Sequence, residues 1–251
     1  LLEYYEYALM TRGNTPVELM HRYRSLVGAL LFPAPMTRPD FLFTAGILAR
    51  AMDFGTEELF QCALYGLVFL GQTHEDGITY SKHAPNAKKL YARADSNWRE
   101  VRSTSGYCIF LGGAVISSRC IRQKCIAMSS TEAELVALAE CAIELVHIIG
   151  LCRFLGLEID EAVEVETDNK GAHDLCHRYS AAQHSKHIDR KMYKMREMRG
   201  AKIATQEPHT LLKRMHIGVW STALFSLLVM AVTVSASRLS LALQVLARVG
   251  A

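Results

Sequence analysis

The sequence Ser129-Ser130-Thr131-Glu132-Ala133-Glu134-Leu135 opens a long helical pattern. Its first four residues fit a capping box, in which Ser129 and Glu132 each satisfy a free backbone N–H group. Apolar residues then recur at helical spacing, at Leu135, Leu138, Ala142, Leu145 and Ile149. The pattern predicts a long amphipathic helix that begins beside Ser129 and packs one face on a core.

Strand patterns lie on both sides of this helix. Residues 90–128 alternate in polarity and contain glycine turns, as in the stretch 106–113, which predicts a strand meander. Residues 163–168 alternate again, and the sequence Asn169-Lys170-Gly171 ends that strand. A basic helix is expected at 178–202. The order of several strands, helix, strand and helix predicts an α/β fold, a mixed sheet with flanking helices.

The preceding part of the chain has a different pattern. Residues 15–72 are predicted to form helices joined by short turns. One of these helices starts at Gly55-Thr56-Glu57-Glu58, where acidic residues complement the helix dipole. Its apolar run, 59–70, is too short to span a bilayer and is typical of a core helix. Breakers at Gly77, Pro85 and Asn86 place a domain boundary near residue 85.

Charge is unevenly distributed along the 251 residues. Half of the residues are apolar, which excludes a disordered or collagen-like chain. The formal charge is −3 over residues 1–85 and +4 over 86–216, although the whole chain carries only +3. The seven cysteines form no C-x-x-C pair, so reduced and mostly buried thiols are expected. His173, Cys176 and His177 could face a metal, but a helix with polar residues is the preferred interpretation.

An uncharged segment lies near the end of the sequence. Residues 217–237 comprise 21 positions, of which 14 are apolar. A helix of that length, at about 1.5 Å per residue, covers a hydrocarbon core of about 30 Å. More basic residues precede the segment than follow it, so as a membrane anchor it would leave the bulk of the chain in the cytoplasm. The alternative is an apolar out-of-frame translation.

Three acidic residues occupy positions where an α/β fold can bring them together. Asp95 lies in a candidate first strand, Glu134 in the first turn of the long helix, and Asp168 at the end of the later strand. Three carboxylates from separate elements can hold two Mg²⁺ ions, since this cation prefers oxygen ligands. On spacing alone, ordinary solvated acids are the preferred interpretation.

Several ordered motifs surround these acids. They are Ala94-Asp95-Ser96-Asn97-Trp98, Arg102-Ser103-Thr104-Ser105-Gly106-Tyr107, the stretch 129–135, Thr167-Asp168-Asn169 and Lys186-His187-Ile188-Asp189. In this order they resemble the ribonuclease H domain of copia-type LTR retrotransposon Pol polyproteins. Upstream, Tyr23-Arg24-Ser25-Leu26-Val27-Gly28 and Thr37-Arg38-Pro39-Asp40 resemble the C-terminal part of the same family's reverse transcriptase. The resemblance covers about residues 15–205.

The resemblance implies an intracellular nuclease that hydrolyses the RNA strand of an RNA–DNA hybrid. Asp95, Glu134 and Asp168 match three of the family's four metal-binding acids, which hold two Mg²⁺ ions, with Mn²⁺ as a substitute. Glu134 is preferred to Glu132 because the family's acid directly precedes the apolar leucine. The ribose 2′-hydroxyl would distinguish RNA from DNA. The hybrid and the remainder of the Pol polyprotein are the implied partners.

The basic segment 178–202 carries eight Lys or Arg residues and two acids. It would lie near the hybrid's phosphates, with Lys186, His187, Arg190, Lys191 and Lys194 as the candidate contacts. A solvated helix face is the alternative. Trp98 and Tyr107 are expected to be core residues.

The chain departs from the family pattern after residue 205. The family's fourth acid belongs to a short helix there, whereas this chain reads Thr205-Gln206-Glu207-Pro208, and only Asp189 or Glu207 could replace it. The predicted organisation is therefore a helical reverse-transcriptase remnant (1–85), a ribonuclease H-like domain (86–205) and a divergent tail (206–251) with a candidate transmembrane helix at 217–237. A non-catalytic relic, anchored to a membrane by that helix, is the alternative to a nuclease.

Overall fold

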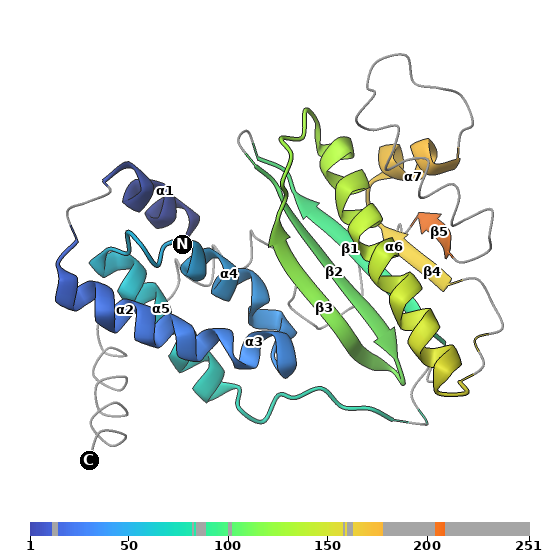
Figure 1. Ribbon diagram of the computed structural model, residues 1–251, viewed down its shortest axis with the longest axis horizontal. Helices are drawn as coiled ribbons and strands as arrows, with labels where there is room; N and C mark the ends of the chain where they lie inside the picture. Colours follow the sequence, from blue (N-terminus) through green and yellow to red (C-terminus); the bar gives the residue numbers. More distant parts are fainter. Residues whose placement is uncertain are drawn as a thin grey trace. The chain divides into compact units, whose positions relative to one another are not determined.

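The structure is a computed structural model of the chain. It describes residues 1–11, 15–81, 83, 89–99, 102–157, 159, 163–177 and 204–208, the last of these as backbone only. The chain divides into two compact units, a helical one formed by Leu1–Gly77 and an α/β one that begins at Ile78 (Figure 1). Each unit has its own hydrophobic core.

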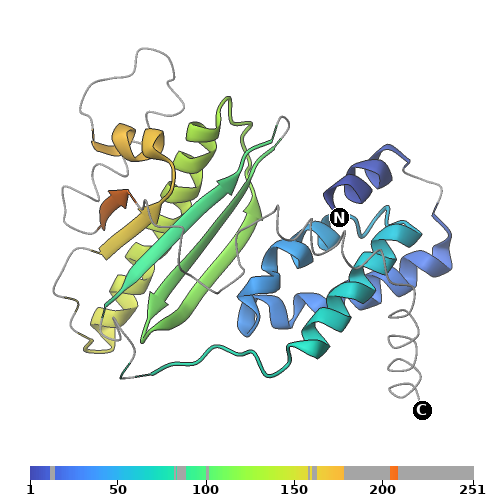
Figure 2. The same cartoon turned by 180° about the vertical axis from the view of Figure 1, so that it is seen from behind.

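The α/β unit is built on a five-stranded mixed sheet with the order β3-β2-β1-β4-β5. β1 (Tyr91–Asn97), β2 (Thr104–Leu111) and β3 (Ala114–Arg122) form an antiparallel meander, while β4 (Val163–Thr167) runs parallel to β1 and β5 (Ala204–Pro208) parallel to β4. α6 (Ser130–Phe154) crosses one face, and Figure 2 shows the opposite face of the meander. The predicted ribonuclease H-like α/β fold is confirmed, whereas β5 was not predicted.

The meander turns at the glycines that the sequence indicated. Gly112 and Gly113 join β2 to β3 with φ angles of 69° and 79°. Two successive positive φ angles define the type I′ turn that matches the twist of a two-residue hairpin. A side chain at either position would strain the backbone, which explains why the pair consists of glycines.

α6 confirms the predicted long helix, but the amphipathic pattern predicted for it is wrong. Residues 132–139 are buried without interruption, because β1, β2 and α7 (Lys170–His177) enclose the first turns. Further along, the outward face carries exposed apolar side chains, among them Ile143, Leu151 and Phe154. Among the described residues α6 is also the one helix long and apolar enough to cross a membrane, and most of it is buried in this unit. Such burial is typical of a core helix.

The helical unit confirms the helices predicted for residues 15–72. Its elements are α1 (Leu2–Met10), α2 (Val17–Leu31), α3 (Pro33–Met36), the short 3-10 helix η1 (Pro39–Phe41), α4 (Leu42–Arg50) and α5 (Glu57–Gln72). Thr56 caps α5 by accepting a hydrogen bond from the N–H of Leu59. In α2, the buried Tyr23 donates its hydroxyl to the Leu48 carbonyl at 2.7 Å, which ties α2 to α4.

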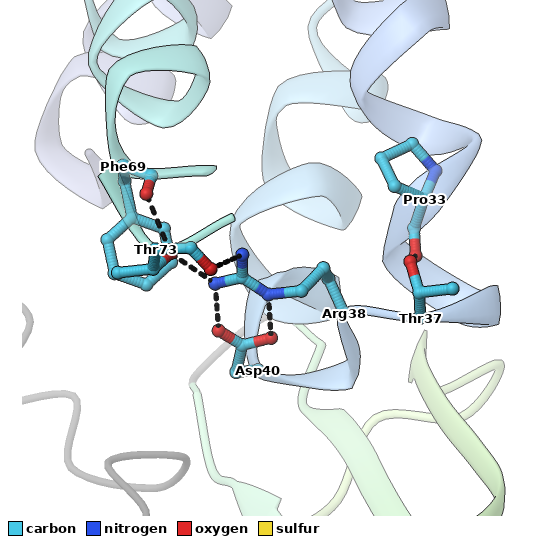
Figure 3. A network of polar contacts seen from close by, with 6 residues as sticks. All are labelled: Pro33, Thr37, Arg38, Asp40, Phe69 and Thr73. Carbon is cyan, nitrogen blue, oxygen red and sulfur yellow. Dashed lines mark hydrogen bonds and ion pairs between the residues drawn. The ribbon is translucent and has the colours of Figure 1, made fainter. Parts of the chain in front are cut away.

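Arg38 joins the turn before η1 to the end of α5 (Figure 3). Its guanidinium donates two bonds to Asp40, at 3.0 and 2.7 Å, and two more to the carbonyl and hydroxyl of Thr73. The charge also lies 5.2 Å from the centre of the Phe69 ring. Only 8% of Arg38 is exposed, so the network replaces most of its hydration.

Candidate metal centre

Three carboxylates converge at one edge of the sheet. β1 and β4 are parallel neighbours with Arg93 opposite Glu166. Asp95 lies two residues further along β1, and Asp168 directly follows the last residue of β4. Glu134 reaches the same edge from the first turns of α6. Ligand oxygens of Asp95, Glu134 and Asp168 all lie within 4.8 Å of one another. The structure thus brings together the three acids that the sequence singled out.

Ser96 orients the carboxylate of Glu134. Its hydroxyl donates to Oε1 of Glu134 at 2.8 Å, and its backbone N–H donates to the same oxygen at 3.0 Å. The N–H also lies 2.7 Å from Oδ1 of Asp95. The other oxygen of Glu134, Oε2, is buried and has no hydrogen-bond partner among the residues that the structure describes. One oxygen is therefore held in place while the second is left free for a ligand.

Burial and mutual repulsion disfavour the ionised state of this cluster. Desolvation, with the nearby charge of Asp95, raises the pKa of Glu134 to about 8. Desolvation and the charge of Asp168 likewise raise the pKa of Asp95 above its usual range. Hydrogen bonds from Ser96 oppose both shifts without cancelling them. A divalent cation would remove the repulsion, so the residues present fit an oxygen-ligated metal.

The loop before α6 fixes the position of Glu134. Ser129 accepts a hydrogen bond from the N–H of Glu132, and Glu132 accepts one from the N–H of Met128 at 2.8 Å. Glu132 is thereby used in the cap, and Glu134 is the acid that joins the cluster. The buried side chain of Gln123 donates to Ser105 on β2 and to the carbonyl of Ala133 on α6.

Ser96 was not predicted from the sequence, and Trp98 differs from its predicted environment. The signal for Ser96 was its position directly after Asp95, but a hydroxyl in a strand has many other uses. Trp98 is 47% exposed, with its indole N–H donating to the Ala127 carbonyl at 3.1 Å, so the expectation of a core residue is wrong for it. Tyr107, only 3% exposed, does belong to the core.

Most of the other candidate residues lie in the hydrophobic core or outside the part of the chain whose side chains are described. Cys176 is buried in the hydrophobic core, and the carboxylate cluster is the one convergent group of metal-ligand side chains among the described residues. All seven cysteines are thiols that form no disulfide bond, and four of them are buried. Lys186, His187, Arg190, Lys191, Lys194 and Asp189, and the segment 217–237, lie outside the described residues. The backbone of Glu207 pairs with Glu166, but its side chain is not described.

We expect Ser96→Ala to weaken divalent metal binding about tenfold, as loss of an outer-shell partner commonly does. The variant keeps the backbone N–H bond but frees Glu134 to rotate. Calorimetric titration with Mn²⁺ measures the effect. Ser117→Ala is the matched control, because Ser117 also donates to a glutamate of α6, Glu144, away from the cluster. Equal Mn²⁺ affinity in the Ser96→Ala and unchanged chains would refute the positioning role.

The metal-free protein is expected to lose stability as the pH rises from about 5 to about 8. In this interval folded Glu134, with its pKa of about 8, keeps a proton that the unfolded chain releases near 4.5. Raising the pH therefore favours unfolding, on the order of 1 kcal/mol per pH unit. Urea unfolding in EDTA at several pH values checks the slope. Glu134→Gln should flatten it, and identical slopes in the two proteins would contradict the assignment.

Comparison with known proteins identifies relatives of the chain. No family model matches the chain. Over 182 residues, 71% of the chain, it is 34% identical to the retrovirus-related Pol polyprotein from transposon RE1 of Arabidopsis thaliana. Over 178 residues, 70% of the chain, it is 32% identical to the corresponding polyprotein from transposon TNT 1-94 of Nicotiana tabacum. The chain spans only 12% and 13% of the lengths of these relatives.

Among solved structures, a ribonuclease H1 isolated from compost, LC11-RNase H1, is 16% identical. The match covers 48% of this chain and 83% of that one, with a TM-score of 0.38. The strand order, the crossing helix and the three acids define a ribonuclease H-like α/β protein. The chain belongs to the copia-type retrovirus-related Pol polyproteins.

Proposed function

We propose that the α/β unit is a ribonuclease H-type nuclease that hydrolyses the RNA strand of RNA–DNA hybrids. The observation that carries this proposal is the cluster of Asp95, Glu134 and Asp168, with one buried oxygen of Glu134 left without a partner among the described residues. Similarity to retrovirus-related Pol polyproteins supports it, because the motifs around these acids resemble the ribonuclease H domain of that family. The cytoplasm or nucleus is the compartment that we propose on the same ground.

Asp95, Glu134 and Asp168 would hold two divalent ions, Mg²⁺ or Mn²⁺. When bound, such ions lower the pKa of a water molecule and stabilise the charge on a leaving oxygen. The chain's own contribution is to fix the ligands on three separate elements, with Ser96 holding Glu134. The 2′-hydroxyl of ribose is the group by which the RNA strand would be chosen over DNA.

The helical unit is proposed to derive from the C-terminal part of a reverse transcriptase, as its motifs at 23–28 and 37–40 indicate. The segment 217–237 remains a prediction as a membrane anchor, with the N-terminal bulk in the cytoplasm. Alkaline carbonate extraction of the full chain tests the anchor, because a wholly soluble protein would exclude it.

Cleavage by the full chain tests the proposed nuclease. An end-labelled RNA–DNA hybrid is incubated with Mg²⁺ or Mn²⁺, beside single-stranded RNA and duplex DNA of the same sequence. We expect cuts only in the RNA of the hybrid and none in EDTA. A chain that cuts no hybrid with either metal would be the non-catalytic relic instead.

A further inference from the structure

Two loops form the border of the metal centre at the end of β1. Residues 98–99 and 102–103 belong to the connection from β1 to β2, and residues 123–129 connect β3 to α6. The N–H of Gln123 donates to the Ser103 carbonyl at 2.8 Å, so β2–β3 pairing continues beyond the strands. The bond from Trp98 to Ala127 joins the same two loops. These two bonds therefore hold the two loops together where β1 ends.

Three exposed basic residues lie along this border, and we call them the basic rim: Arg102, Arg122 and Lys124. Arg122 pairs with Thr104 at the end of the β2–β3 ladder. Arg102 lies two residues before Thr104 and Lys124 two residues after Arg122, so both residues lie just beyond the end of the ladder. The rim thus concentrates three positive charges at one end of the sheet.

Arg122 of the basic rim lies on the same face of the sheet as Asp95. Asp95 is opposite Gly106 on β2, and Gly106 is opposite Cys120 on β3. Because side chains alternate, Arg122, two residues after Cys120, points to that face as well. Arg122 lies on the second strand from β1 and two residues further toward the end of β1 than Asp95. Its Cα is therefore about 10 Å across the sheet and about 7 Å along it from the Cα of Asp95. A polymer bound at the centre would pass within reach of the rim.

The basic residues of the rim differ in their partners from the other basic residues around β1. Lys89 and Arg93 form ion pairs with Glu164 and Glu166 of β4. By contrast, no carboxylate among the described residues pairs with Arg102, Arg122 or Lys124. The nearby acids Asp95, Glu134 and Asp168 converge on one another instead. The rim is thus free to bind an external anion.

We propose that the basic rim binds the backbone phosphates next to the cleaved phosphodiester of the RNA–DNA hybrid. The inference rests on the proposed function. Three carboxylates repel a polyanion, and metal ions offset that repulsion only at the centre itself. Cations about 12 Å away would hold the neighbouring phosphates, giving affinity that is independent of base sequence and sensitive to salt.

The test measures hybrid binding as a function of salt. In an Asp95→Asn background, which prevents cleavage, the affinity for a fluorescent RNA–DNA hybrid is measured by anisotropy. Each of Arg102→Gln, Arg122→Gln and Lys124→Gln should weaken binding about fivefold at 0.1 M salt. Each should also reduce the slope of log K against log salt by about 0.8, and the triple variant should lose about 100-fold.

Arg153→Gln is the matched control. Arg153 is exposed in the last turn of α6, about 30 Å along the helix from Glu134, and its loss should leave the affinity unchanged. Arg122→Lys keeps the charge and should retain the salt slope. In the cleaving protein, the rim variants should raise KM and change kcat little.

The outcomes separate the two proposals. A full chain that binds the hybrid with the same salt slope in the triple variant would overturn the rim and leave the nuclease standing. A full chain that neither binds nor cleaves the hybrid would overturn the nuclease and the rim together. Melting temperatures equal to that of the unchanged protein establish that the variants are folded.

Discussion

Replacing Asp95 with asparagine is expected to reduce kcat for hybrid cleavage at least about 1000-fold. The amide keeps the size of the side chain but removes the negative charge that would hold a divalent ion between β1 and β4. The same change should leave the metal-free protein at least as stable, because burial and the charge of Asp168 already raise the pKa of Asp95. An inactive protein with an undiminished melting temperature in EDTA is the expected combination.

Glu164→Gln is the matched control for this experiment. Glu164 lies on β4, four residues before Asp168, and pairs with Lys89 rather than with the cluster. We expect its loss to change kcat no more than about threefold, as an outlying ion pair contributes little. Cleavage that survives Asp95→Asn would exclude Asp95 as a metal ligand. Cleavage lost equally in both variants would show that the loss reflects disturbed folding rather than the removal of a metal ligand.

Replacing Arg38 with alanine is expected to destabilise the helical unit by about 3 kcal/mol. The substitution leaves the Asp40 carboxylate, whose side chain is only 27% exposed, without its partner. It also removes both bonds to Thr73 and so releases the end of α5. Hydrogen exchange read by mass spectrometry resolves peptides of α2 and α5 from those of the sheet, and measures this loss in the full chain.

Arg24→Ala provides the comparison. Arg24 also pairs with an aspartate, Asp53, but the side chains are 47% and 87% exposed. Such a pair contributes less than about 1 kcal/mol, so exchange should change little. Arg38→Lys should give a loss of protection between those of Arg38→Ala and Arg24→Ala, because the lysine ammonium cannot reproduce the planar set of N–H donors of the guanidinium. Equal protection in Arg38→Ala and Arg24→Ala would refute the importance of the network.

The sequence was sufficient where local rules decide the structure. The capping box at Ser129, the glycine pair that turns β2 into β3, and the alternation of residues 163–168 all act over a few residues. The convergence of the acids followed from a fold-level rule, since parallel strands end at the same edge. The choice of Glu134 over Glu132 came from family resemblance alone, and the structure shows the reason, because Glu132 is used in the cap.

Features that depend on distant partners were not predicted. Ser96 is 38 residues from Glu134, and Arg38 is 35 residues from Thr73, so no local pattern links either pair. β5 was not predicted because Glu207 and Pro208 are poor strand formers, and pairing with β4 decides their conformation. The outward face of α6 was expected to be polar, but it carries exposed apolar side chains. The spacing of apolar residues does not show which neighbours pack on a helix.

The strand order has a consequence for when the centre forms. β1, β2 and β3 pair through short connections, so they can fold as soon as they exist, and α6 follows directly. β4 must pair with β1 across 73 residues, from Arg93 to Glu166, and long loops close late. Asp168 arrives only with that closure. A nascent chain that has not reached β4 therefore holds two of the three acids, and the carboxylate cluster cannot be complete in it.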